Sequence, residues 1–399
     1  MTSKVVVIGL GYVGLPLAIA AAKSGYSVVG IDKNVEKVNQ IKLGNSPVED
    51  IDNVELQRFL SSRSLQVSTD YAEILSAHII LICVPTPLLD NKFPDLSNIE
   101  SAVLSFREFV TEGSLVILES TVAPGTTRDF LKPLLKRDTS SSSINSAIDI
   151  AFSPERVDPL NKNWNLKNTP KIVAGLTEKS KRRAVEFYSR FVDQVIPCQS
   201  IEVAETAKLL ENSFRLVNIS LINEISKVCY KLGIEIGQVI EAAATKPYGF
   251  MPFYPSLGVG GHCIPVDPIY LSSKAKEVGE PIHLIDLASK INFSMPQYFT
   301  IRAKERLTEL KGKKILVVGV SYKPNVSDIR ETPVESLIVN LRQQGAEVSW
   351  HDDLVGEWKG EKSIALSADF DLAILATPHD YLDLTKLGAV PLLNTKGSS

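Results

Sequence analysis

A glycine-rich turn near the N-terminus constrains the fold of this chain more than any other feature. The apolar run 5–8 is followed by Gly9, Gly11 and Gly14 in the pattern G-x-G-x-x-G, and then by the apolar stretch 15–23. A strand, a glycine turn and a helix in this order begin the βαβ unit that binds dinucleotides. The alternative interpretation is a glycine turn that holds no ligand.

An aspartate follows this turn at the distance that dinucleotide-binding units require. Asp32 comes directly after the second predicted strand, residues 27–31. A carboxylate about 20 residues beyond the glycines can bond a ribose 2′-hydroxyl. An acid here favours NAD over NADP because it repels a 2′-phosphate, although Lys33, which follows directly, weakens that preference. We therefore predict NAD as the cofactor.

The composition indicates a soluble globular protein and excludes several classes. The 399 residues are enough for two or three domains, and the net charge of -3 argues against nucleic acid as the main partner. No apolar run approaches the roughly 18 residues that cross a membrane, and no signal peptide is recognisable. The cysteines are widely spaced, which predicts neither a disulfide framework nor a metal site. We expect a reduced, cytoplasmic protein. The cysteines are Cys83, Cys198, Cys229 and Cys263.

The order of apolar segments predicts three domains. Strands alternate with helical segments over residues 1–199, which indicates an NAD-binding, Rossmann-like domain with a doubly wound parallel sheet. Residues 200–310 are mainly helical, and residues 311–399 form a second α/β domain without a glycine fingerprint. Further strands are expected at 79–84, 115–119, 148–152, 314–319, 346–350, 371–376 and 390–393, a helix at 333–344, and a surface loop at 140–143.

A long helix is expected to open the central domain, from Ile201 to Leu232. Its apolar residues recur at spacings of four and three, which places them on one face. A helix of this length with a broad apolar face suits packing between domains or against a second copy of the chain. We predict a homodimer or a higher homo-oligomer. The residues of this face are Leu210, Phe214, Val217, Leu221, Ile225 and Val228.

A cysteine in the central domain lies in a loop of glycines and prolines. The segment 258–268 reads GVGGHCIPVDP, with Cys263 four residues before Asp267. Glycines allow a close backbone approach to a ligand and prolines stiffen the exit, which suits a nucleophile presented to a substrate. The alternative is a small buried hydrophobic residue, an interpretation that fits the other three cysteines. His262 could act as a base, but we expect it to shape the loop.

Polar residues on the long helix form a second candidate group. Lys208, Asn212 and Arg215 share one face, roughly opposite the apolar stripe. A lysine and an amide on one face could stabilise a developing oxyanion. The spacing alone favours the alternative of a face exposed to solvent.

Several polar residues follow the ends of predicted strands, where open parallel sheets bind ligands. Each could equally reflect turn chemistry or a charged loop, since prolines lie nearby. They are Thr86, Thr121, Glu155 and Arg156 in the first domain, with Lys323 and Arg330 in the third.

Taken together, these segments resemble the UDP-glucose/GDP-mannose dehydrogenase family over essentially the whole chain. The resemblance implies that an NAD-dependent enzyme of nucleotide-sugar and polysaccharide biosynthesis oxidises a 6-hydroxymethyl group to a carboxylate while two NAD are reduced. The segments that carry the resemblance are 9–15, 119–127, 153–159, 204–215, 258–268 and 322–333.

The resemblance also implies roles for individual residues. Cys263 corresponds to the catalytic thiol, Lys208 and Asn212 to its oxyanion partners, and Asp267 to the aspartate that assists hydrolysis. Thr121 and Glu155 correspond to positions that hold water and assist proton transfer. Cofactor contacts are implied for Gly9, Gly11, Tyr12, Val13, Gly14, Asp32, Thr86, Thr121 and Arg330. Substrate contacts are implied for Arg156, Val157, Lys208, Asn212, Arg215, Tyr254, Gly260 and Lys323.

The segments 258–268 and 242–255 look most like those of family members that oxidise UDP-N-acetylglucosamine. UDP-N-acetylmannosamine and UDP-glucose stay open as substrates. So do two other classes, a nucleotide-sugar binding protein without activity and a two-electron dehydrogenase of small hydroxy acids. Three places depart from the usual family pattern: Leu160, the pair 256–257 and the segment 394–397.

Overall fold

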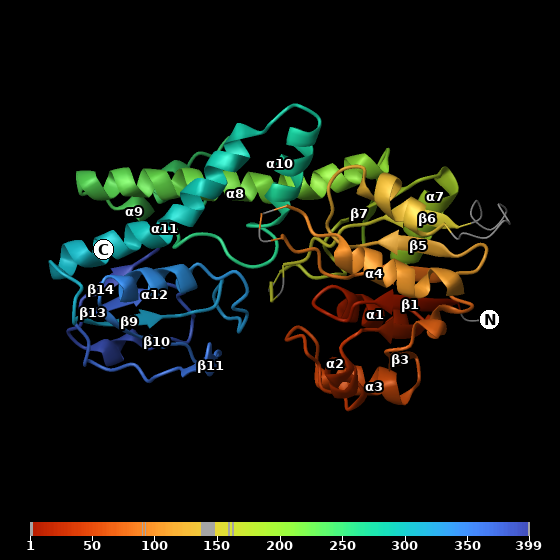
Figure 1. Ribbon diagram of the computed structural model, residues 1–399, viewed down its shortest axis with the longest axis horizontal. Coiled ribbons are helices and arrows are strands. Elements are labelled where there is room, and N and C mark those ends of the chain that lie inside the picture. The colour runs from red at the N-terminus through yellow and green to blue at the C-terminus, as the bar shows by residue number, and fades with distance from the viewer. Residues whose placement is uncertain are drawn as a thin grey trace. The chain divides into compact units, whose positions relative to one another are not determined.

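The computed structural model describes residues 3–89, 91, 93–136, 148–158, 160–161 and 163–397. The expected surface loop at 140–143 lies outside these residues. Internal contacts divide the chain into two compact units, Met1–Leu210 and Glu211–Ser399 (Figure 1). The expected division into three domains at residues 199 and 310 stays a prediction.

The first unit alternates strands and helices, as its apolar pattern predicts. Its elements are β1 Lys4–Ile8, α1 Gly14–Lys23, β2 Ser27–Ile31, α2 Val35–Lys42, α3 Asn53–Ser61, β3 Leu65–Ser68, η1 Tyr71–Ile74, β4 Ile79–Ile82, α4 Ser97–Phe106, η2 Arg107–Phe109, β5 Leu115–Leu118, η3 Thr127–Leu131, α5 Lys132–Leu134, β6 Asp149–Phe152, β7 Lys171–Gly175, α7 Glu178–Tyr188 and β8 Val195–Pro197.

The described strands of this unit form one sheet in the order β3-β2-β1-β4-β5-β6-β7-β8. Successive side chains of a strand point to opposite faces, so Val5 and Val7 join one core and Val6 and Ile8 the other. Helices α1, α2, α3 and α7 cover the first face, and α4 covers the second. The sheet is therefore doubly wound, as predicted.

The sheet also differs from the sequence-based prediction. Strands β3, β7 and β8 were not expected, and β7 pairs antiparallel with β6, so the sheet is mainly parallel rather than fully parallel. The short strand β7 follows Pro170, and β8 ends at Pro197, which obscures both as apolar runs. The predicted strands are present, with ends that differ by one or two residues.

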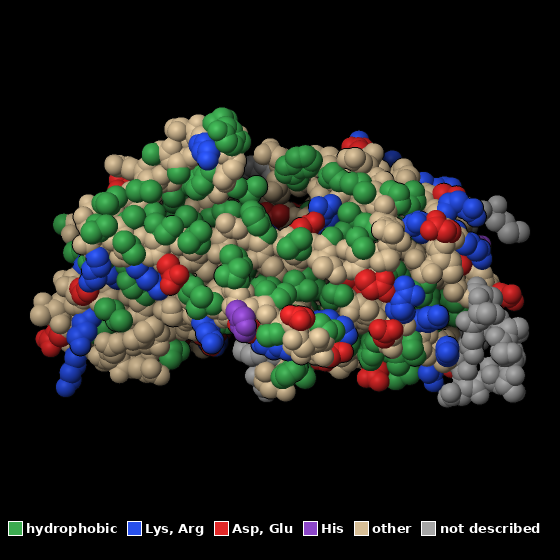
Figure 2. All heavy atoms as spheres, turned by 90° about the horizontal axis from the view of Figure 1, so that it is seen from above, with side chains coloured by type: hydrophobic (Ala, Val, Ile, Leu, Met, Phe, Trp, Pro, Cys, Tyr) green, Lys and Arg blue, Asp and Glu red, His purple; other side chains and the backbone are tan. Residues whose placement is uncertain are grey.

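Helix α8 spans Ile201–Leu232, the bounds that the apolar spacing predicts, and it continues from the first unit into the second. The apolar stripe is exposed in the single chain: Leu210 by 61%, Leu221 by 52% and Val228 by 58%. Figure 2 looks onto the side of the molecule where α8 lies and shows hydrophobic side chains gathered there. The polar residues Lys208, Asn212 and Asn223 are buried instead.

The second unit continues with helices and then a smaller sheet. Its remaining elements are α9 Ile236–Ala244, α10 Asp267–Glu277, α11 His283–Leu307, β9 Lys314–Val318, α12 Val334–Gln343, β10 Glu347–His351, β11 Glu357–Trp358, β12 Glu361–Lys362, β13 Leu372–Leu375, η4 Leu384–Leu387 and β14 Leu392–Asn394.

Four of these strands form a parallel sheet in the order β10-β9-β13-β14. Residues of α11 and α12, including Phe299 and Leu337, pack on one face of it together with Trp350. Leu316 and Leu375 point to the opposite face, where Leu387 covers them. This second α/β arrangement agrees with the sequence-based prediction.

Candidate active site

The glycine turn of the first unit has the shape that a dinucleotide requires. Gly9 adopts a φ of +92°, and a Cβ there would lie 2.6 Å from the Cys83 carbonyl oxygen. A Cβ on Gly14 would lie 1.8 Å from the Gly9 oxygen, so strand and helix can approach only without side chains. At Gly11 a Cβ would meet nothing within 4 Å. The space above Gly11, beside the N-terminus of α1, therefore fits a pyrophosphate.

Asp32 lies at the end of β2 beside this turn. It is 7% exposed, and its carboxylate accepts hydrogen bonds from the backbone amides of Leu10 at 2.9 Å and Asn34 at 2.9 Å. The ammonium of Lys37 lies 2.7 Å from Oδ2. Burial by itself would raise the pKa of Asp32, but the hydrogen bonds from Lys37, Asn34 and Leu10 outweigh it and lower the pKa. Asp32 therefore presents an ionised acceptor for a ribose.

Two lysines lie near Asp32, and the one that pairs with it is not the one that follows it directly in the sequence. Lys33 bonds to the side chain of Asn98 at 3.1 Å and does not pair with Asp32. Lys37 makes the ion pair from the first turn of α2. A lysine five residues beyond the acid carries no motif, so only the helix geometry reveals it.

The ends of the neighbouring strands bring two predicted residues together. The hydroxyl of Thr86, after β4, donates to the carbonyl oxygen of Thr121, after β5, at 2.8 Å. The hydroxyl of Ser120 donates to Val84 O at 2.6 Å. Tyr12 and Val13 are half-buried just before α1. Thr86 and Thr121, which the sequence placed at one edge of the sheet, are thus joined there by a hydrogen bond.

Glu155 follows β6 and is held by its own loop. Its Oε1 accepts hydrogen bonds from the amides of Arg156 and Val157, both at 2.7 Å, and its side chain is 16% exposed. The guanidinium of Arg156 donates to Pro170 O at 2.6 Å. The carboxylate of Glu155 is therefore oriented by backbone amides, as a group that positions water or a proton needs to be.

A buried charged cluster that the sequence did not predict lies next to Glu155. Lys171, at the start of β7, places its Nζ 2.8 Å from Glu119 and 3.9 Å from Glu155. The Tyr188 hydroxyl also donates to Glu119. Burial raises the pKa of Glu119 to about 7. Burial opposes the charge of Lys171, but Glu119 and Glu155 outweigh it and raise its pKa, so the ammonium stays charged and holds both carboxyl groups.

Lys208 and Glu205 lie one turn apart on α8 in the first unit. Lys208 is only 6% exposed, so the interpretation of a solvated face was wrong here. Glu205 is fully buried and accepts hydrogen bonds from the amides of Gly125 at 2.6 Å and Thr127 at 2.9 Å. Burial raises the pKa of Glu205 to about 7. Glu205 thereby fixes α8 to the start of η3, and it was missed because the sequence gives it no local signal.

In the second unit, Cys263 lies in an exposed loop just before α10. Its carbonyl oxygen accepts hydrogen bonds from the amides of Val266 at 3.2 Å and Asp267 at 2.8 Å, which fixes the residue to the helix N-terminus. The interpretation of Cys263 as a buried hydrophobic residue was therefore wrong. The loop needs its glycines, because a Cβ on Gly260 would lie 2.7 Å from the side chain of Tyr322.

Three predicted residues meet where α8 crosses the start of α10. The Asn212 amide donates to Oδ2 of Asp267, and the Arg215 guanidinium donates to Oδ1 of Asn212. Asn212 is 1% exposed and Asp267 4%. The nitrogen and the oxygen of the Asn212 amide are both hydrogen-bonded, so the orientation of this side chain is fixed. Because Asn212 is also buried, the interpretation of a face exposed to solvent was wrong for it as well.

The start of the cysteine loop is anchored by buried amides. Asn223 accepts from the Ser256 backbone amide at 2.9 Å and donates to Asn292 at 3.1 Å. Ser256 also forms a hydrogen bond within the loop, because its hydroxyl donates to Gly258 O at 3.0 Å. Ser256 belongs to the pair 256–257, which the sequence analysis singled out as a departure from the expected pattern. Its hydrogen bonds thus supply rigidity ahead of the cysteine.

The other predicted residues of the second unit lie in exposed or half-buried loops. Tyr254 is 55% exposed, and Lys323 lies in the loop after β9. Arg330 forms a fork with Asp328, with Nε 2.8 Å from Oδ1. Burial and the nearby Arg330 charge lower the pKa of His262, which favours the neutral imidazole.

Within the described residues, no group of three or more His, Cys, Asp or Glu side chains could hold a metal ion. No described helix has the length and apolarity needed to cross a membrane. The features that point to a function are the glycine turn that fits a dinucleotide and the exposed cysteine in the loop just before α10. They define an NAD-dependent oxidoreductase.

The comparisons with known proteins place this oxidoreductase among the nucleotide-sugar dehydrogenases. The NAD binding, central and UDP binding domains of the UDP-glucose/GDP-mannose dehydrogenase family match residues 3–192, 202–294 and 316–392. The chain belongs to this family and is an NAD-dependent UDP-sugar dehydrogenase.

Relatives with two different names are similar to the chain. UDP-N-acetyl-D-mannosamine dehydrogenase of Methanococcus maripaludis is 37% identical, over 96% of this chain and 88% of the relative. UDP-N-acetyl-D-glucosamine 6-dehydrogenase of Pseudomonas aeruginosa is 34% identical, over 88% and 83%. The solved structure of the UDP-D-ManNAc dehydrogenase from Pyrococcus horikoshii superposes with a TM-score of 0.88 at 32% identity, over 98% of this chain and 95% of that one.

Proposed function

We propose that this enzyme oxidises C6 of a UDP-N-acetylhexosamine to the uronic acid through a thioester on Cys263. Our first candidate for the substrate is UDP-N-acetylglucosamine. The observation that carries the proposal is the exposed thiol, fixed just before α10, with the Asn212–Asp267 pair at the start of the same helix. A thiol allows the second oxidation because it converts an aldehyde into an adduct that can lose hydride.

The first oxidation needs a base for the 6-hydroxyl proton. NAD held at Gly9, Gly11, Gly14 and Asp32 supplies, when bound, the hydride acceptor for each oxidation. A water near Glu155 or Thr121 takes the proton, and the amides that orient the Glu155 carboxylate keep it directed at that water.

Cys263 carries the second half of the reaction. Its sulfur, reacting as the thiolate, adds to the aldehyde carbon, and the aldehyde oxygen takes up the proton that the thiol has lost, which gives a thiohemiacetal. Loss of a hydride and a proton then leaves the thioester. Water cleaves the thioester with help from Asp267, which releases the carboxylate and the thiol. Lys208 and Asn212 stabilise the negative oxygen, a contribution worth about 100-fold in rate for each donor of this kind.

We assign one set of residues to the diphosphate of the UDP-sugar and another set to its sugar ring. Arg156, Arg215 and Lys323 supply positive charge for the diphosphate, as guanidinium and ammonium groups do at phosphates. Val157, Tyr254 and Gly260 complete the pocket. We also propose that the enzyme works in the cytoplasm, where cysteines stay reduced, and that it is a homodimer through the exposed apolar stripe of α8.

UDP-N-acetylmannosamine is the second candidate substrate, and the relatives of that name support it. UDP-glucose is a third. The deciding experiment supplies each UDP-sugar in turn and follows NADH formation together with product acid. We expect two NADH per UDP-N-acetylglucosamine and a lower kcat/KM for the other sugars. One NADH per sugar would reject the four-electron scheme, and no NADH with any sugar would indicate a binding protein.

A cysteine variant tests the thioester itself. Cys263→Ser should abolish acid formation, whereas Cys198→Ser, at a half-buried cysteine without an assigned role, should keep wild-type rates. A normal yield of acid from Cys263→Ser would overturn the proposal.

A further inference from the structure

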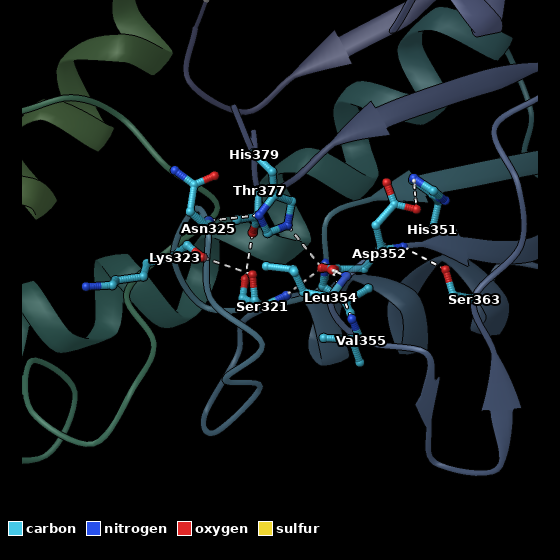
Figure 3. A network of polar contacts seen from close by, with 12 residues as sticks. Ser321, Lys323, Asn325, His351, Asp352, Leu354, Val355, Ser363, Thr377 and His379 are labelled. Carbon is cyan, nitrogen blue, oxygen red and sulfur yellow. Dashed lines mark hydrogen bonds and ion pairs between the residues drawn. The ribbon is translucent and has the colours of Figure 1, made fainter. Parts of the chain in front are cut away.

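A buried polar network lies at the carboxyl ends of β9, β10 and β13 and has no role in the chemistry described so far (Figure 3). Its centre is Asp352, which directly follows β10 and is 0% exposed. The Asp352 carboxylate accepts hydrogen bonds from four backbone amides and one histidine. These donors are Val320 at 2.8 Å, Ser321 at 3.4 Å, Leu354 at 3.0 Å, Val355 at 3.2 Å and His379 Nε2 at 3.1 Å.

Asp352 occupies the place that Asp32 has in the first sheet. Each follows the second strand of a βαβ unit, and each accepts from the amide one residue beyond a glycine with positive φ. Gly9 N bonds to Ile31 O at 2.7 Å, and Gly319 N bonds to the residue before Asp352 at 2.8 Å. Asp32 faces the open dinucleotide turn, whereas Asp352 is fully buried and is bonded to His379. The Asp352 carboxylate therefore stabilises the loop after β9 and is not available to a ligand.

His379 connects this buried acid to the loop after β9. Its Nδ1 accepts the Asn325 backbone N–H at 2.9 Å, so Nε2 carries the ring hydrogen and donates to Asp352. Asn325 has a φ of 64°, and its side-chain amide exchanges two further hydrogen bonds with Asp380, at 2.9 and 3.0 Å. The loop is thus fixed at Asn325 in an unusual backbone conformation.

The same loop is fixed on the other side of Lys323. The Ser321 hydroxyl donates to the Lys323 carbonyl at 2.9 Å, and the Thr377 hydroxyl donates to Ser321 O at 2.6 Å. Figure 3 shows the Lys323 side chain directed away from the network, so the backbone is held while the ammonium extends outward. Binding an anion costs less conformational entropy when the backbone that carries the lysine is already fixed than when the loop must be ordered at the same time.

We propose that Asp352 and His379 are positioning residues for Lys323, and that they thereby set the affinity of the enzyme for the diphosphate of its nucleotide sugar. The inference rests on the proposed function, in which Lys323 contacts that diphosphate. His379 and Asp352 do not touch the substrate; they act through the backbone of residues 321–325.

Two nearly isosteric variants separate the two bonds of His379. His379→Gln can keep a donor toward Asp352 but loses the acceptor for the Asn325 amide. His379→Asn keeps an acceptor near the Nδ1 position. We expect His379→Gln to weaken binding of UDP, measured by calorimetry on the full chain, about 10-fold. His379→Asn should weaken it less. In turnover, KM for the sugar should rise while kcat and KM for NAD stay within about two-fold.

A double-variant cycle shows whether His379 acts through Lys323. Lys323→Met alone should weaken UDP binding, and adding His379→Gln should weaken it no further. Additive losses would overturn the proposal, because the two residues would then act independently. Should His379→Gln fail to fold, Asn325→Gly keeps the positive φ and removes the two bonds to Asp380, and its effect should likewise vanish in the Lys323→Met background.

The same measurements separate this inference from the proposed function. Wild-type protein that binds neither UDP nor a UDP-sugar would reject the proposed substrate class. Wild-type protein that binds UDP, beside a folded His379→Gln variant that binds it equally well, would reject only the positioning role.

Discussion

The side-chain amide of Asn212 donates a hydrogen bond to the Asp267 carboxylate and thereby joins the middle of α8 to the first residue of α10. Asp267 is 4% exposed and lies four residues after Cys263. A nearly buried carboxylate that the Asn212 amide orients in this position is suited to activate water for thioester hydrolysis. The pair thus links the oxyanion partner and the hydrolytic residue in one contact.

Asp267→Asn should separate oxidation from hydrolysis. The variant keeps the shape of the side chain and removes its charge, so we expect a burst of two NADH per active site, followed by turnover slowed about 100-fold. The burst is measured by rapid mixing, and mass spectrometry should find the acyl group on Cys263. Asn212→Ala should show no burst, because it removes an oxyanion donor from both oxidations. Wild-type acid release from Asp267→Asn would contradict the assignment.

The ion pair between Asp32 and Lys37 predicts how cofactor preference can be changed. Asp32→Ala removes the ribose acceptor and should raise KM for NAD by about 10-fold or more. It also leaves Lys37 without its 2.7 Å partner, so NADP should become usable. The double variant Asp32→Ala with Lys37→Met should lose that gain. The measurement is kcat/KM for both cofactors, and an unchanged preference in Asp32→Ala would contradict the role.

The sequence was sufficient for features that depend on neighbouring residues. The turn of Gly9, Gly11 and Gly14 and the position of Asp32 follow from strand, turn and helix in one short stretch, and the structure has them where predicted. The bounds of α8 were predicted as well, since 32 residues of continuous periodicity leave little ambiguity.

The sequence could not predict which helix face would be buried. Periodicity assigns residues to faces, but burial depends on the elements that later pack there. Asn212 is buried because Asp267 of α10 meets it, and Asn223 because Asn292 of α11 does. Leu221 and Val228, on the face that we expected to pack between domains or against a second copy, are exposed in the single chain. Lys171 was missed for a similar reason, since its partner Glu119 is 52 residues away.

Replacing only one partner of the buried ion pair between Lys171 and Glu119 should lower the stability of the fold strongly. Lys171→Met leaves Glu119 without its cation, and removing one partner of a buried pair typically costs about 3–5 kcal/mol. The double variant Lys171→Met with Glu119→Gln should recover most of the loss, because Gln still accepts the Tyr188 hydroxyl. Thermal unfolding of the three proteins measures this. Equal destabilisation by the single and double variants would show that the pairing contributes little.

The exposed stripe of α8 predicts the oligomeric state. Leu221→Glu combined with Val228→Glu places two charges on this face, and burying an unpaired charge in an apolar interface is strongly unfavourable. Light scattering should then report a monomer where the wild type gives a dimer. Val54→Glu, at a residue of α3 that is 73% exposed, is the matched control and should leave the mass unchanged. A monomeric wild type would contradict the proposed dimer.

The burial of Glu205 predicts a pH dependence of stability. Its pKa rises from an ordinary 4.5 to about 7 in the folded protein, so the folded state holds a proton that the unfolded state has lost. Stability from this group is fully present below about pH 4.5 and is lost as pH rises through about 7, by up to about 3 kcal/mol. Glu205→Gln cannot lose that proton, so its stability relative to the wild type should increase between pH 5 and 7.5.

Glu202, one turn earlier on α8, provides the opposite case. A hydrogen bond from Arg128 lowers the pKa of Glu202 to about 2. Its stabilisation is present above the unfolded pKa and is lost only as pH falls toward about 2, so Glu202→Gln should differ from the wild type by a constant amount between pH 5 and 7.5. Unfolding temperatures of the three proteins across this range test both signs. A Glu205→Gln difference that stays flat with pH would mean that Glu205 is already ionised in the folded state.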